Sequence, residues 1–102
     1  MKTKNTSWYI LHAPEKGKKY EEFHKSCHEA GVLDKTTKEL LLLALASVFR
    51  NSENVEDHLK GAIRAGATKE EITEVLLITA AEKAENQLSW AKDIYCKYIG
   101  QA

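Results

Sequence analysis

The sequence predicts an all-α fold, a single domain over residues 1–102 with about five helices. Apolar residues recur at helical spacing, and the alternation of apolar and polar residues that marks strands is nearly absent. One proline and five glycines leave few turn signals, which favours short connections between helices. A chain of 102 residues suffices for one small domain, whose buried surface only just offsets chain entropy.

Pro14 separates two predicted segments of the N-terminal part, an arm before it and a helix that begins with it. Residues 8–12 are expected to form a short extended arm. Pro14 suits the first turn of a helix, because its missing N–H needs no partner there, and Gly31 ends that helix. Apolar residues recur along it at helical spacing: Tyr20, Phe23, Cys27 and Ala30.

The second predicted helix is unusually apolar. Thr36 and Glu39 have the spacing of a capping box, and they precede residues 40–46, a run that is apolar on every side. Such a helix must be covered all round. In so short a chain the intramolecular partners do not suffice, so we expect a homo-oligomer.

The remaining helices have clear boundaries. The third begins at or just after Asn51, a favoured cap, and stops at Gly66. Thr68 and Glu71 form a second capping box that opens the fourth helix. The last segment, residues 88–98, keeps the helical period up to Gly100, and the sequence leaves open whether the chain bends near Asn86.

Charge and composition exclude several partners. Fifteen Lys and Arg balance fifteen Asp and Glu, so no basic field attracts nucleic acid. No apolar run approaches the roughly 20 residues that span a bilayer, and no signal peptide is present, so we expect a cytoplasmic protein without membrane contact. The two cysteines make no Cys-x-x-Cys, which excludes a disulfide scaffold or a four-thiolate zinc site.

Two segments in the middle of the chain carry a family resemblance: LDKTTKELLLLALA over residues 33–46 and HLKGAIRAGATKEEITEVLL over residues 58–77. Together they resemble the carboxymuconolactone decarboxylase and alkylhydroperoxidase D-like superfamily. The resemblance implies a compact all-helical fold built around a helical hairpin and assembled as trimers or hexamers.

The resemblance also implies a site. In the peroxidase branch, a Glu in the preceding helix and a Cys-x-x-Cys-x-x-x-His sequence form a thiol and proton-relay centre. Glu39 matches that Glu and His58 matches that His, whereas Asn51 and Asn54 occupy both cysteine positions. Because asparagine cannot attack a peroxide or form a disulfide, peroxidase chemistry by this route is excluded.

What remains is similar to the decarboxylase branch, which lacks the paired cysteines and processes an anionic lactone acid by proton transfer. Asn51, Asn54 and His58 lie at i, i+3 and i+7, on one helix face, with Arg50 beside them. We therefore predict Glu39 and His58 as catalytic residues, and Asn51, Asn54 and Arg50 as ligands of a small carboxylate or lactone acid. We expect neither a metal nor a cofactor.

Each of these residues also has an ordinary structural explanation. Glu39 could serve only the capping box, and His58 could be a hydrogen-bonded interior imidazole. Asn51 is best explained as a cap, and Arg50 could be a solvated charge that offsets the negative end of the preceding helix.

Three side chains outside the motif offer other possible functions, as metal ligands or as a reactive thiol. His24 and His28 have the spacing of two metal ligands, but with no clear third ligand a solvated or interfacial pair is favoured. Cys27 could act as a substitute thiol in an antioxidant protein, although a small core residue is the simpler interpretation. A scaffold that has lost catalysis and serves as an oligomeric binding module is the other rival function.

Overall fold

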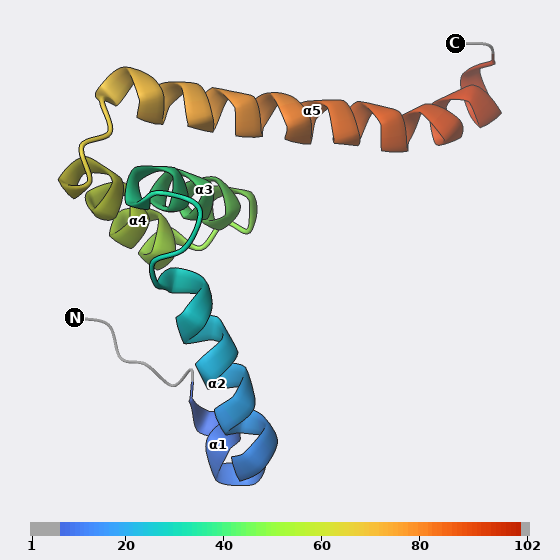
Figure 1. Cartoon of the computed structure of the whole chain (residues 1–102). Coiled ribbons are helices and arrows are strands. Elements are labelled where there is room, and N and C mark those ends of the chain that lie inside the picture. The colour runs from blue at the N-terminus through green and yellow to red at the C-terminus, as the bar shows by residue number, and fades with distance from the viewer. Residues whose placement is uncertain (1–6, 101–102) are drawn as a thin grey trace.

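The structure, a computed structural model, describes residues 7–100, and the regular elements over that part of the chain are all helices, which confirms the predicted all-α fold (Figure 1). The helices follow one another in this order: α1 (Trp8–His12), α2 (Pro14–His28), α3 (Lys35–Val48), α4 (Ser52–Arg64) and α5 (Lys69–Ile99).

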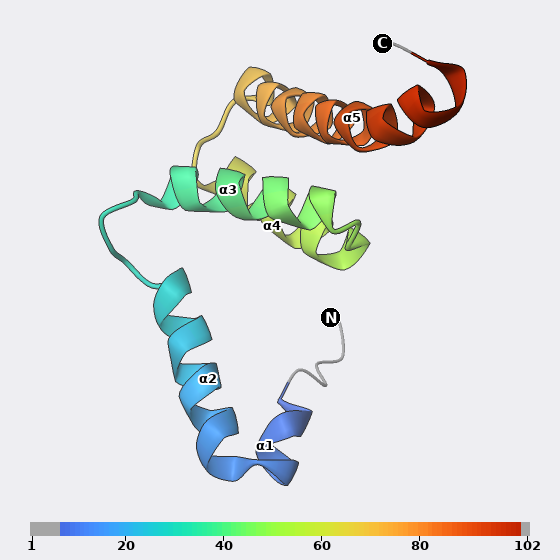
Figure 2. The ribbon, with the colours of Figure 1, turned by 90° about the vertical axis from the view of Figure 1, so that its right-hand side faces the viewer.

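The centre of the fold is a helical hairpin. Helices α3 and α4 lie side by side, and the beginning of α5 packs on α3 (Figures 1 and 2). The core forms where these three elements meet: Leu43 and Ala62 are fully buried and Ile72 nearly so. This confirms the expected hairpin, and the Glu39 and His58 positions lie on its two helices.

The start of α3 differs from the sequence interpretation. Asp34 is the N-cap, and its carboxylate accepts a hydrogen bond from the backbone N–H of Thr37 at 2.8 Å. The Thr36 hydroxyl instead donates to the carbonyl oxygen of Ala65 at 2.8 Å, at the end of α4. The predicted capping box of Thr36 and Glu39 is therefore wrong, because the chain enters the helix earlier. The Glu39 side chain is left free for another contact.

The cap makes the stability of α3 depend on pH. The hydrogen bond from Thr37 lowers the pKa of the Asp34 carboxyl from its ordinary value of 3.8. The cap therefore stabilises the fold fully at pH values above the pKa that the Asp34 carboxyl has in the unfolded chain. This stabilisation is lost as the pH falls through the lower pKa of the same carboxyl in the folded chain. We predict that Asp34→Ala lowers the thermal unfolding midpoint at neutral pH, and that the difference from wild type vanishes in acid.

The matched control is Asp34→Asn, which keeps an acceptor at the cap but has no carboxyl to titrate. Its midpoint should stay near that of wild type at neutral pH. Equal midpoints for wild type and Asp34→Ala at neutral pH would contradict this role of Asp34.

The turn between α3 and α4 is closed by the backbone. Asn51 caps α4 by accepting from the N–H of Asn54 at 3.1 Å, as predicted. Arg50 adopts a left-handed φ of 58° while the N–H of Asn51 donates to the carbonyl of Ala46. For a residue with a Cβ this conformation costs roughly 1–2 kcal/mol. Gly66, with φ of 101°, ends α4 as predicted.

The expected extended arm over residues 8–12 is wrong, because these residues form α1 and fold back on α2. Ile10 lies against Gly17, where a Cβ would come within 2.9 Å of the Ile10 Cα atom. The Tyr9 hydroxyl donates to Glu21, which raises the Tyr9 pKa to about 12. These contacts with α2 outweigh the local preference for an extended chain.

Helix α5 runs for 31 residues without a break, so the last segment with helical periodicity continues the helix that begins at Lys69. Its second half projects away from the other helices (Figure 1). The radius of gyration is 18.4 Å, whereas a compact chain of about 100 residues has roughly 13 Å. None of the described helices is long and apolar enough to span a membrane.

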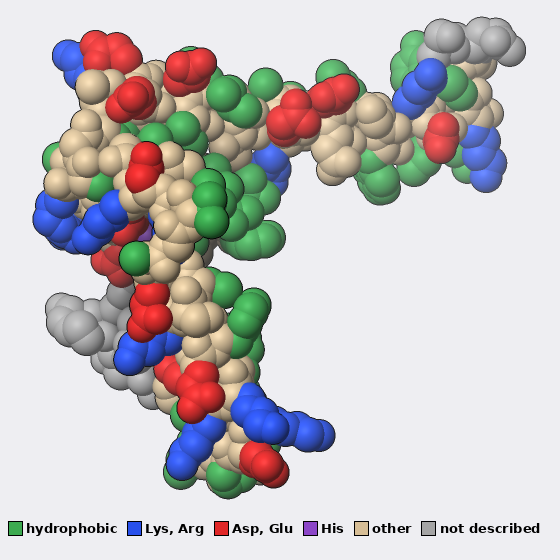
Figure 3. Space-filling view, in the orientation of Figure 1, with side chains coloured by type: hydrophobic (Ala, Val, Ile, Leu, Met, Phe, Trp, Pro, Cys, Tyr) green, Lys and Arg blue, Asp and Glu red, His purple; other side chains and the backbone are tan. Residues whose placement is uncertain are grey.

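Much apolar surface is therefore uncovered in one chain. Hydrophobic side chains lie along α5 and on the flank of the hairpin (Figure 3). The exposed large residues of α3 and its end are Leu41, Leu45 and Phe49, and those of the second half of α5 are Leu88, Trp90, Ile94, Tyr95, Tyr98 and Ile99.

Candidate active site

Glu39 of α3 and His58 of α4 meet across the helical hairpin. The Glu39 Oε1 and His58 Nδ1 atoms are 3.0 Å apart, and each side chain is 21% exposed. A carboxylate can only accept, so the His58 Nδ1–H donates to it. This contact fixes which ring nitrogen carries the proton and leaves the His58 Nε2 atom free for another partner.

Gly61 makes the room that Glu39 needs. It is buried in α4, and a Cβ at this position would lie 2.6 Å from the Glu39 carboxyl carbon. Glycine inside a helix is about 1 kcal/mol less favourable than alanine, so a glycine here indicates a close approach. The sequence interpretation missed Gly61, although a glycine in the middle of a well-formed helix was the available signal.

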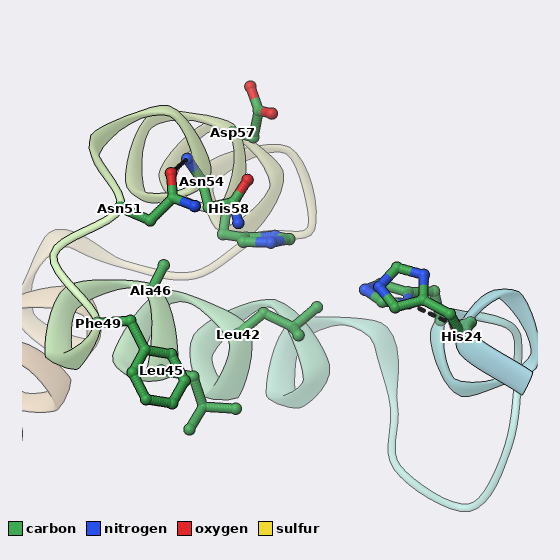
Figure 4. A pocket seen from close by; sticks show the side chains of 10 residues that line it. His24, Leu42, Leu45, Ala46, Phe49, Asn51, Asn54, Asp57 and His58 are labelled. Carbon is green, nitrogen blue, oxygen red and sulfur yellow. Dashed lines mark hydrogen bonds between the residues drawn. The ribbon is translucent and has the colours of Figure 1, made fainter. Parts of the chain in front are cut away.

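His58 borders a cavity of about 340 Å³ between the hairpin and the end of α2 (Figure 4). This volume lies within the range of about 300–1,000 Å³ that is usual for small-molecule sites. Glu39 is not among the lining residues, and it contacts His58, which is. The lining residues are His24, His28, Leu42, Leu45, Ala46, Phe49, Asn51, Asn54, Asp57 and His58.

The cavity has an apolar wall and polar ends. Leu45 and Phe49 lie on the α3 side, while Asn51 and Asn54 project from the start of α4 beside His58 (Figure 4). The Asn54 side chain is half-buried and carries two N–H donors. A small molecule with an apolar body and one or two acceptor oxygens fits these surroundings.

Arg50 lies elsewhere. It is exposed and borders a separate, open hollow with Ser47, Val55 and Glu56, among others, not the cavity of His58. Of the three residues predicted to bind a ligand, the structure places Asn51 and Asn54 at the cavity, and Asn51 also serves as a cap.

The cysteines are not at this cavity. Cys27 is exposed on α2, so its interpretation as a core residue is wrong for the single chain. The reason is that this face of α2 is little covered: Tyr20 and Phe23 are both more than half exposed, although the Tyr20 ring contacts the Tyr9 ring of α1 edge to face. Among the described residues no cluster of three or more His, Cys, Asp or Glu side chains could hold a metal ion.

The protein is thus an all-helical protein whose central hairpin pairs a glutamate with a histidine. The cavity beside this pair has no cysteine among its described lining residues. The sequence model of the carboxymuconolactone decarboxylase family matches residues 14–94. The chain therefore belongs to this family.

One curated relative is "Uncharacterized protein 4 in cox locus" of Paracoccus denitrificans, with 44% identity over 54 residues. The aligned region covers 53% of this chain and 49% of the relative, so the match spans about half the length of that protein. The name of this relative states no activity. No solved structure matches the chain.

Proposed function

We propose that this protein is a carboxymuconolactone decarboxylase family enzyme without thiol chemistry, which binds a small carboxylate or lactone acid and transfers a proton through His58. The contact between Glu39 and His58 at the edge of the cavity is the observation that carries this proposal. The Asn51 and Asn54 side chains replace the thiols that a peroxidase of this family needs.

His58 acts as the acid or base through Nε2, since Nδ1 is held by Glu39. Glu39 is a positioning residue: it orients the imidazole and stabilises the imidazolium that forms when Nε2 takes up a proton. The Asn54 amide donates to an oxygen on which negative charge develops, and the apolar wall keeps water away from that charge.

In a decarboxylation, the bond between the carboxylate and its carbon breaks and carbon dioxide leaves. The electron pair stays on that carbon and spreads onto the neighbouring lactone carbonyl, whose oxygen accepts a hydrogen bond from Asn54. Protonated His58 then gives its Nε2 proton to the carbon. No oxidant, metal or thiol enters this step.

We further propose that the active form is a homo-oligomer, a trimer or hexamer. The support is the uncovered apolar surface of α3 and α5 and the extended shape of one chain. Soluble proteins rarely leave apolar surface of this extent in water, and most oligomers are symmetric copies of one chain.

A thermal-shift screen tests the binding part of the proposal. Small lactone acids and other carboxylates, compared with their methyl esters, are expected to stabilise the protein, by up to about 2.7 kcal/mol at a concentration 100 times Kd. Asn54→Ala should reduce this stabilisation, while Arg50→Ala, outside the cavity, should leave it intact. Stabilisation by none of the carboxylates would favour a non-catalytic oligomeric module instead.

A further inference from the structure

The cavity has a second polar end that the proposed proton transfer does not use. His24 and His28, in the last two turns of α2, both border it opposite His58. Their ring centroids are 4.6 Å apart with planes at 38°, so the two imidazoles lie against each other. They come from α2 and His58 comes from α4, and the loop after α2 turns the chain so that all three border the same cavity.

The charges around the cavity single out this pair. None of the described residues that border it is Lys or Arg, and Arg50 borders a different hollow. The charge of a protonated His58 is balanced by the Glu39 carboxylate. The one acidic residue at the cavity, Asp57, directs its carboxylate away from His58 (Figure 4). His24 and His28 are therefore the groups that can present an unbalanced positive charge to a ligand.

Hydrogen bonding also leaves the pair available. The Nδ1 atom of His28 lies 2.9 Å from the carbonyl oxygen of His24, to which it donates. Within residues 7–100, no side chain or carbonyl is hydrogen-bonded to the Nε2 atom of His28 or of His58. In Figure 4 the His24 ring lies across a gap from the His58 ring, with Leu42 beside that gap, and His28 borders the same cavity. A gap with imidazoles on both sides and hydrocarbon beside it suits a carboxylate on a small apolar body.

We propose that His24 and His28 bind the carboxylate of the ligand and thereby direct the rest of the molecule toward His58 and Asn54. This inference rests on the proposed function and adds the orientation of the substrate in the cavity. It assigns the binding of the anion to the end of α2, not to the start of α4 beside Arg50.

The test compares carboxylates with amides of the same shape: benzoate with benzamide, and phenylacetate with phenylacetamide. At about pH 6, wild type is expected to bind each carboxylate about tenfold more tightly than its amide, because a hydrogen bond from an imidazolium to a carboxylate is stronger than one to a neutral amide. The double variant His24→Gln with His28→Gln should lose this preference and bind the amides unchanged. Single variants His12→Gln, a histidine outside the cavity, and Arg50→Gln should keep it.

Two different results would overturn the inference, and they show whether the proposed function fails with it. If the double variant keeps the preference and Arg50→Gln loses it, the anion binds at the start of α4 and only the inference fails. If wild type prefers neither carboxylate, carboxylate binding itself is wrong and both fail. Imidazole NMR of wild type makes the test independent of the variant's folding: at saturation, benzoate must shift the His24 and His28 signals more than benzamide does, and equal shifts would contradict the inference.

Discussion

Turnover of the carboxylates selected by thermal shift is expected to fall by about 10²–10⁴-fold in His58→Gln, the usual contribution of a general acid or base. Glutamine keeps a polar side chain of similar reach, but it cannot exchange a proton near neutral pH. The loss should appear in kcat, since binding of the carboxylate depends on other side chains of the cavity. Steady-state kinetics of wild type and variant measure it.

Two further variants separate positioning by Glu39 from structural effects. Glu39→Gln and Gly61→Ala should each lower kcat by less than His58→Gln and leave KM nearly unchanged. The alanine Cβ would occupy the place of the Glu39 carboxylate, 2.6 Å from its carbon, so the flexible side chain must move away from His58. Alanine favours the helix by about 1 kcal/mol, so the fold should survive.

The control for Gly61→Ala is Gly31→Ala, where the nearest atom to a new Cβ is the Lys38 Nζ at 3.8 Å. This variant should retain full turnover. Full turnover in His58→Gln would remove His58 from the mechanism.

The second large effect concerns assembly. Leu88→Glu combined with Tyr95→Glu is expected to convert a trimer or hexamer into monomers of 11.5 kDa and to lower the thermal unfolding midpoint. Both side chains are more than half exposed in the single chain, and they lie on one face of α5. Two carboxylates on that face would have to lose their water in an apolar interface, which is unfavourable.

Sedimentation at several protein concentrations measures the assembly. Asn86→Glu, on the opposite face of α5, adds the same kind of charge and should leave the mass unchanged. A wild-type protein that sediments as a monomer throughout would show that the exposed apolar face is not covered by copies of this chain.

The parts of the fold that depend on neighbouring residues were predictable from the sequence. The Asn51 cap, the Gly66 stop and the capping box of Thr68 and Glu71 each involve hydrogen bonds within a few residues, and all three are confirmed. Such signals are local, because the side chain and the backbone group it caps are fixed by the same helical turn.

The predictions were wrong where a contact with a residue distant in the sequence determines the local structure. Thr36 donates to Ala65, 29 residues further on, so its local spacing to Glu39 was misleading. Residues 8–12 are helical because they pack on α2, which their own composition does not show. Whether the chain bends near Asn86 stayed open because helical periodicity does not report the direction of a helix, and the structure shows one continuous α5.

The site was predictable in part for the same reason. Glu39 and His58 lie on consecutive helices of a hairpin, and the family resemblance alone pairs them. Gly61, and the position of His24 and His28 at the same cavity, depend on how closely two helices approach and how a loop turns. No spacing in the sequence reports such distances.

The most direct test is the tautomer of His58, observed by long-range ¹H–¹⁵N correlation of its imidazole. We predict that the neutral ring carries its proton on Nδ1 with Nε2 unprotonated, and that Gly61→Ala or Glu39→Ala abolishes this preference. A His58 ring protonated on Nε2 in the wild-type protein, or one unaffected by both substitutions, would contradict the pairing from which the proposed chemistry is derived.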